Sequence, residues 1–168
     1  MFDGVVLGVD PGTASVGLAV VQGRSGRPVI RWAATLRTPA GMPAGDRLHR
    51  IHEGVRRVID EHGPSAVAME RLMWGRNTRS AMEVARASGV IVLAATEAGV
   101  PVDEYAPLEV KMAVTGVGNA PKDQVRRALV RVLGAEGVPD QPDAADAAAV
   151  AVCHLQQARI RTAVKAAR

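Results

Sequence analysis

The chain has very few aromatic residues and a single cysteine. Phe2, Trp32, Trp74 and Tyr105 are the only aromatic residues among 168, so the core must be built mainly from Val, Ile, Leu, Met and Ala. Cys153 is the only cysteine, which excludes both an intrachain disulfide and a cysteine-based zinc site. Because Cys153 lies in the apolar run 147–155, we predict a buried, structural thiol.

Long apolar segments and a basic leader are also missing. Apolar runs such as 90–96 are far too short to cross a bilayer. The N-terminus leads directly into an apolar strand with no basic segment before it, which argues against a signal peptide. We therefore expect a cytoplasmic protein with no membrane contact.

Lysine is scarce as well, with three lysines among 21 basic residues, but the balance of charge is positive. The net charge is +4 and the isoelectric point is about 10.0. This fits a polyanionic partner, because bound Lys and Arg release counterions from phosphates, although codon bias also produces an excess of arginine. A hydrophobic content of 48% and a mean hydropathy of +0.06 exclude a disordered chain. The length suits one domain, 1–168, with a basic C-terminal tail from about 156.

The pattern of apolar residues predicts an α/β fold. Three strands, 4–9, 15–21 and 29–37, open the chain as an antiparallel meander, and an amphipathic helix then ends at Gly63. The remaining predicted elements are strand 65–69, helix 77–98, strand 101–105 and helices 108–115, 121–133 and 143 to about 163. Strands followed by alternating helices and strands indicate a mixed sheet.

Two carboxylates directly follow predicted strands. Asp10 follows an apolar run and precedes a Pro-Gly turn, and Glu70 ends a similar run. Glutamate is disfavoured in strands and costly near a core unless it is paired or bound to metal. Plainer explanations are a turn aspartate bonded to its own backbone and a surface glutamate paired with Arg71 or Arg76.

Two further acids, Asp143 and Asp146, follow Pro142 and are three residues apart, so they share one face of the last helix. The helix dipole and N-capping stabilise acids in a first turn, and Asp143 could be no more than the cap. The apolar run 147–152 nevertheless indicates that this helix start packs on the core. There, two carboxylates repel each other unless a cation lies between them.

Acids at element ends, without a cysteine or histidine cluster, suit Mg²⁺ or Mn²⁺ rather than Zn²⁺. Two such ions about 4 Å apart clamp the attacking water and the leaving oxygen of a phosphoryl displacement. His154 is too far along the last helix from Asp146 to be an obvious ligand. We interpret it as a packing residue.

Taken together, these segments resemble the RuvC family of Holliday junction resolvases, which have a ribonuclease H-like fold. The resemblance extends from residue 7 to about 154. It is carried by LGVDPGT at 7–13, AME at 68–70, VK at 110–111, TGVG at 115–118, Lys122 and PDAADA at 142–147. One DPG or DxxD motif alone is weak evidence, but the order, spacing and context of the whole set are specific.

The resemblance implies a five-stranded mixed sheet flanked by helices. It also implies that Asp10, Glu70, Asp143 and Asp146 are the catalytic residues and the ligands of two Mg²⁺ ions, for which Mn²⁺ can substitute, with Asp10 between the ions. Family members act as homodimers that cut four-way junction DNA symmetrically in recombination and repair. The small-residue segment 85–89 matches their dimer helix, and the RuvA–RuvB branch-migration complex is an implied partner.

Four more positions are assigned to DNA by the resemblance. Lys111 and Lys122 fall where the family is basic, and Lys122 also begins a predicted helix, where backbone N–H groups favour phosphate. Without the resemblance both would be taken as solvated surface lysines. Where the family commonly has an aromatic residue that stacks on a junction base, this chain has Met73, followed by Trp74. Base stacking by Trp74, an apolar wedge formed by Met73, and simple packing of Trp74 remain open.

Three other functions fit parts of the sequence. The Asp-Pro-Gly-Thr segment at 10–13 resembles the phosphate loop of actin-like and sugar kinases, but those folds need two domains, and 168 residues are too few. Another ribonuclease H-like nuclease, acting on RNA–DNA hybrids or ribosomal RNA, is disfavoured by the DxxD pair and the VK…GVG…K block. A catalytically silent junction-binding module is disfavoured because all four acids are present.

Overall fold

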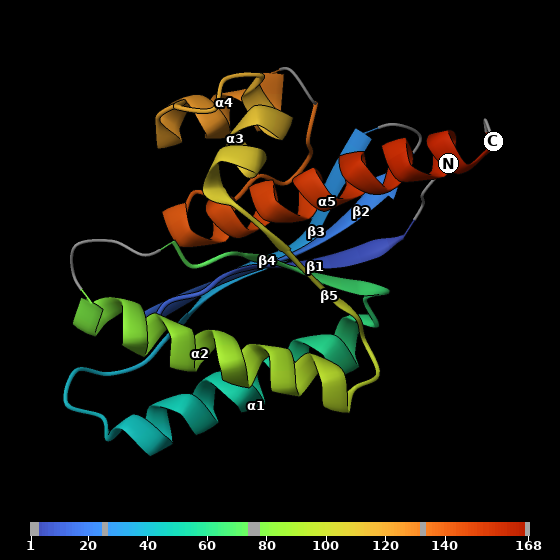
Figure 1. The fold of residues 1–168 in the computed structure, drawn as a ribbon. Coiled ribbons are helices and arrows are strands. Elements are labelled where there is room, and N and C mark those ends of the chain that lie inside the picture. Colours follow the sequence, from blue (N-terminus) through green and yellow to red (C-terminus); the bar gives the residue numbers. More distant parts are fainter. Residues whose placement is uncertain (1–3, 25–26, 74–77, 132–133, 167–168) are drawn as a thin grey trace.

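A central sheet carries helices on both faces. This computed structural model describes residues 4–24, 27–73, 78–131 and 134–166 (Figure 1). Two helices lie on one face, α1 (Ala44–His62) and α2 (Thr78–Glu97). The other face carries α3 (Pro107–Thr115), α4 (Lys122–Arg131) and α5 (Pro142–Ala166).

The sheet has five strands in the order β3-β2-β1-β4-β5. Their bounds are β1 (Val5–Asp10), β2 (Ser15–Arg24), β3 (Arg27–Arg37), β4 (Ala66–Glu70) and β5 (Val102–Tyr105). The first three strands pair antiparallel, whereas β4 runs parallel to β1 and β5 parallel to β4. The predicted five-stranded mixed sheet with an opening meander is therefore confirmed.

The central strands divide the core into two apolar layers. Side chains alternate along β1, so Leu7 and Val9 pack against α1 and α2, whereas Val6 packs in the layer of α5. The α5 layer is rich in alanine, which lets the helix lie close to the sheet. Cys153 is fully buried in this layer, which confirms the predicted burial of its thiol.

The last helix is longer than predicted. It begins at Pro142 and continues to Ala166, against a predicted end at about residue 163, so residues 156–166 of the predicted basic tail are helical. Within the described residues, no helix is both long and apolar enough to cross a membrane.

Candidate active site

Three of the four predicted acids line one pocket of about 190 Å³. Asp10 ends β1 and Glu70 ends β4. These parallel strands are neighbours whose register pairs Val9 with Met69, so the two acids follow side by side at the same edge of the sheet. Asp146 enters from α5, and Lys111 and Lys122 complete the charged lining.

The fourth acid, Asp143, lies near the pocket but does not line it. Because α5 begins at Pro142, Asp143 lies within the first turn rather than at the N-cap position. Its negative charge still contributes to the raised pKa of Asp10. The structure therefore brings Asp143 into the electrostatic environment of the other acids.

Two strand glycines let α5 approach the sheet closely enough to deliver its acids. A Cβ atom on Gly17 would lie 2.0 Å from the backbone oxygen of Asp143 and 3.2 Å from the Cβ of Asp10. A Cβ on Gly8 would lie 2.0 Å from the backbone oxygen of Ala147. Glycine inside a strand often marks such a close backbone approach. These two glycines are the signal in the sequence that could have revealed the contact.

The crowding of acids disfavours their ionised forms. Burial and, after it, the negative charges of Glu70 and Asp146 together raise the pKa of Asp10 from 3.8 to about 7, against an opposing effect of Lys122. Burial also raises the pKa of Glu70, as does Asp146, whereas Lys122 and Lys111 lower it. The pocket therefore holds more negative charge than its two lysines neutralise.

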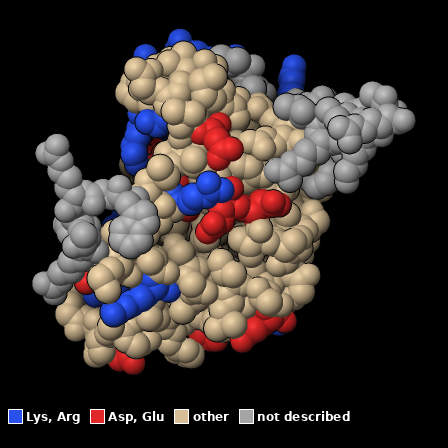
Figure 2. Space-filling view, in the orientation of Figure 1, with Lys and Arg blue, Asp and Glu red and all other residues tan. Residues whose placement is uncertain are grey.

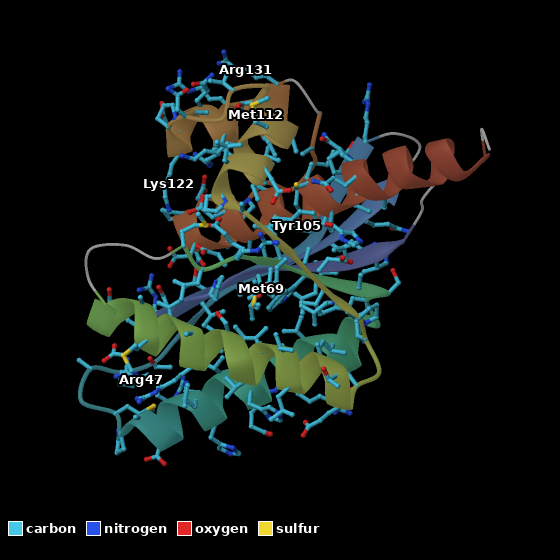
Figure 3. All side chains as sticks on the ribbon, viewed as in Figure 1. Arg47, Met69, Tyr105, Met112, Lys122 and Arg131 are labelled. Atoms are coloured by element: carbon cyan, nitrogen blue, oxygen red, sulfur yellow. The ribbon has the colours of Figure 1, made fainter. Side chains whose placement is uncertain are left out.

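Lys122 extends from the first turn of α4 toward the start of α5 (Figure 3). Its ammonium group donates a hydrogen bond to a carboxylate oxygen of Asp146, and this bond raises the pKa of Lys122. The side chain of Lys122 is 72% exposed, and that of Asp146 is 20% exposed. A phosphate entering the pocket would therefore meet an ammonium group that is already held in place.

The burial of Asp10 and its repulsion by neighbouring acids predict a pH-dependent stability. Since the pKa of Asp10 in the folded protein exceeds its usual value, the folded state binds more protons between about pH 4 and pH 7. In EDTA, the free energy of unfolding should therefore fall as the pH rises through that window and level off above it. Asp10→Asn removes the titrating group, so at pH 8 the variant should have a higher melting temperature than the wild type. The increase should be about 2–4 °C for each kcal/mol gained in the free energy of unfolding.

Melting curves recorded in EDTA from pH 4 to pH 8.5 would measure this difference. Asp60→Asn is a matched control, because Asp60 is exposed on α1 and paired with Arg56. A difference in melting temperature between Asp10→Asn and the wild type that stays constant from pH 4 to pH 8.5 would contradict the prediction. Added Mg²⁺ should reduce this difference, since a bound cation relieves the repulsion among the acids of the wild type.

Among the described residues, no three acidic, histidine or cysteine side chains form a closed metal-binding cluster. The acids instead surround the pocket, with Lys122 interposed at Asp146. Their donor chemistry nevertheless fits a divalent cation. Carboxylate oxygens are hard ligands, and the pocket lining holds three acids against two lysines.

The alternative pairing of Glu70 with Arg71 is not observed. Arg71 instead lies 4.0 Å from Glu104 on β5 and donates to its backbone oxygen. Arg76 and Trp74 lie outside the described residues, so the stacking predicted for Trp74 stays a prediction. Met73, just after β4, is 60% exposed, which an apolar wedge requires.

Sequence reasoning missed the apolar walls of the pocket, Pro107 and Val110 of α3, Val125 of α4 and Ala149 of α5. Only the VK segment at 110–111 pointed to this region. His154 is buried, as its interpretation as a packing residue requires, and its Nδ1 lies 2.9 Å from the hydroxyl of Tyr105. This contact links the end of β5 to α5.

Known proteins resemble this chain over almost its whole length. The family model "Crossover junction endodeoxyribonuclease RuvC" matches residues 6–154. A RuvC from Moorella thermoacetica is 47% identical over 150 residues, which cover 89% of this chain and 90% of that protein. One from Streptomyces avermitilis is 45% identical, covering 91% and 88% respectively.

Solved structures agree with these sequence matches. T. thermophilus RuvC in complex with a Holliday junction substrate superposes with a TM-score of 0.87 at 37% identity, covering 95% of this chain and 97% of that one. The yeast mitochondrial resolvase Ydc2 superposes with a TM-score of 0.71 over 95% of this chain and 81% of its own. At 13% identity, that likeness concerns the fold alone.

Proposed function

Since this chain belongs to the RuvC family of crossover junction endodeoxyribonucleases, we propose that it resolves Holliday junctions by hydrolysing DNA phosphodiesters symmetrically during recombination and repair. The observation that carries the proposal is the pocket where β1, β4 and α5 bring Asp10, Glu70 and Asp146 together beside two lysines. Acids that repel one another provide sites for cations, and lysines beside them provide sites for a phosphate.

Asp10, Glu70, Asp143 and Asp146 are proposed as the catalytic residues and metal ligands. Their oxygen donors suit Mg²⁺, and Mn²⁺ should substitute because it takes the same ligands. Two bound Mg²⁺ ions would activate the attacking water and stabilise the leaving oxygen. The buried setting of Asp10 and Glu70 strengthens electrostatic interactions there, because the surrounding protein screens charge less than water does.

Lys111 and Lys122 are proposed to bind the backbone phosphates of the scissile strand. They approach the pocket from two different helices, α3 and α4. Two separate ammonium groups fix the position of a phosphate better than one group does. Met73 is proposed as an apolar contact to a junction base, and we retain Trp74 as the alternative.

A homodimer is the proposed assembly, and α2 is its proposed interface. Met82, Ala85, Gly89 and Leu93 recur at helical spacing and are all exposed. No heavy atom comes within 4 Å of a Cβ built on Gly89, so a second helix has room to approach. We further propose that residues 1–168 act as one nuclease domain in the cytoplasm and that RuvA–RuvB presents the junction to the dimer.

Cleavage of a mobile four-way DNA junction tests this function directly. The wild type should make paired, symmetric nicks with Mg²⁺ or Mn²⁺ and none with EDTA. Linear duplex DNA and an RNA–DNA hybrid of matched sequence serve as competing substrates. Equal cutting of all three would overturn the resolvase proposal in favour of another ribonuclease H-like nuclease. Junction binding without any cutting would favour a silent binding module.

A further inference from the structure

Three large apolar side chains are strongly exposed on α3 and the loop that follows it. Leu108 is 61% exposed, Met112 47% and Val117 42%. Gly118 lies against the first two, because a Cβ on it would come within 3.1 Å of Leu108 Cγ and 3.5 Å of Met112 Cγ. Leu108, Met112 and Val117 thus border one small region, which we name the α3 ridge.

The α3 ridge lies next to the catalytic pocket. Pro107, Val110 and Lys111 of the same helix line that pocket. Each helical residue is turned by about 100° from the one before, so Leu108 is one step around the helix from Pro107, and Met112 is one step from Lys111. Figure 2 shows a broad uncharged surface over α3 and the α3–α4 loop, with both basic and acidic side chains along its lower edge.

The charges around the α3 ridge favour a polyanionic partner with an apolar part. Lys111 and Lys122 lie on its pocket side. Glu109 is engaged locally, because its carboxylate accepts a hydrogen bond from the backbone N–H of Ala106. Asp123, at the start of α4, is paired with Arg127. Apolar groups beside ammonium groups match a nucleotide, in which a flat base is joined to a phosphate.

We propose that the α3 ridge packs against a base that is unstacked at the branch point of the junction, holding the strand open while its phosphate enters the pocket. Leu and Met are among the side chains that proteins insert against unstacked base steps. This inference rests on the proposed resolvase function and adds a contact on α3 to the one proposed for Met73. The two contacts would act from different elements, because Met73 follows β4.

A double variant, Leu108→Gln with Met112→Gln, tests the α3 ridge. Both side chains are exposed and glutamine is a good helix former, so the fold should persist. Val130→Gln is the matched control, because Val130 is 49% exposed on α4 and lies outside the ridge. The probe is a four-way junction with 2-aminopurine at its branch point, whose fluorescence rises when that base unstacks.

The double variant should cut the intact junction about 10- to 100-fold more slowly, the range expected for losing a base contact. It should also lose most of the 2-aminopurine signal that the wild type produces, even in EDTA. A junction with mismatched bases at its centre should restore cutting, since its strands are already open. The Val130→Gln control should match the wild type in cutting the intact junction, in 2-aminopurine fluorescence and in cutting the mismatched junction.

Wild-type cutting and fluorescence in the double variant would overturn the α3 ridge proposal and leave the resolvase function standing. An equal loss of cutting rate by the double variant on intact and mismatched junctions would also overturn the α3 ridge proposal. Such a loss would indicate a general defect in folding or phosphate binding, which does not depend on strand opening. If the wild type fails to cut junctions while its 2-aminopurine fluorescence still rises, the result contradicts the resolvase function and supports the base contact. No signal from either protein would overturn the base contact.

Discussion

Asp10→Asn is expected to slow junction cutting by about 10³-fold or more while leaving junction binding intact. Asp10 ends β1 inside the acidic pocket and feels the charges of Glu70, Asp146 and Asp143. Burial and these charges raise its pKa to about 7, so a bound cation would strongly stabilise its ionised form. A loss of several kcal/mol in transition-state stabilisation corresponds to three or more powers of ten in rate.

Binding should survive this change because asparagine keeps the shape of aspartate and removes a negative charge that repels phosphate. Single-turnover cutting with Mg²⁺ and gel-shift titration in EDTA measure the two effects separately. Asp60→Asn, the same chemical change on the outer surface of α1, should alter neither. Junction cutting by Asp10→Asn at the wild-type rate would remove Asp10 from the proposed catalytic residues.

The positions of Asp10 and Glu70 at the ends of central strands were predictable from sequence. Each directly follows a short apolar run, and such runs in an α/β pattern form central strands. Two parallel neighbours end at the same edge of a sheet, so their terminal acids meet. The strand order could not be predicted from the residues alone, because apolar runs identify strands without fixing which strands pair.

The contribution of α5 was only partly predictable. The spacing of Asp143 and Asp146 placed them on one helical face, but it could not show that the helix crosses β1 and β2 at backbone contact. That approach depends on Gly8 and Gly17, which lack the side chains that would keep the helix away. Glycine in a strand has several possible causes, so the sequence alone did not select this one.

The pairing of Lys122 with Asp146 lay beyond sequence reasoning for a different reason. It joins residues on two helices, and its geometry depends on how α3 and α4 pack beside α5. The resemblance assigned Lys122 to DNA, whereas the structure shows it bound to one of the predicted metal ligands. An ammonium group in that position lowers the pKa of Asp10 and of Glu70, so Lys122 partly offsets the repulsion among the acids.

Gly17→Ala is expected to destabilise the protein by about 3 kcal/mol or more, at the upper end of overpacking effects. The new methyl group would lie 2.0 Å from the backbone oxygen of Asp143, and backbone cannot rotate away as a side chain can. The first turn of α5 must therefore move off the sheet. At 2–4 °C per kcal/mol, the melting temperature should fall by roughly 6–12 °C.

The same displacement should impair catalysis beyond the loss of folded protein. Gly17 pairs with Asp10 across β1 and β2, so the helix would move at the position where Asp143 approaches Asp10. A shift of about 1 Å in a catalytic group can cost about 100-fold in rate. Junction cutting well below the melting temperature of the variant, normalised to the folded fraction, measures this effect.

Gly45→Ala provides the matched control for this prediction. Gly45 lies in the first turn of α1, and a Cβ built on it meets no heavy atom within 4 Å. The alanine should therefore stabilise the protein by up to about 1 kcal/mol and leave cutting unchanged. If Gly17→Ala instead melts and cuts as the wild type does, α5 does not depend on backbone contact with β2, and another feature of the fold must hold Asp143 and Asp146 beside Asp10.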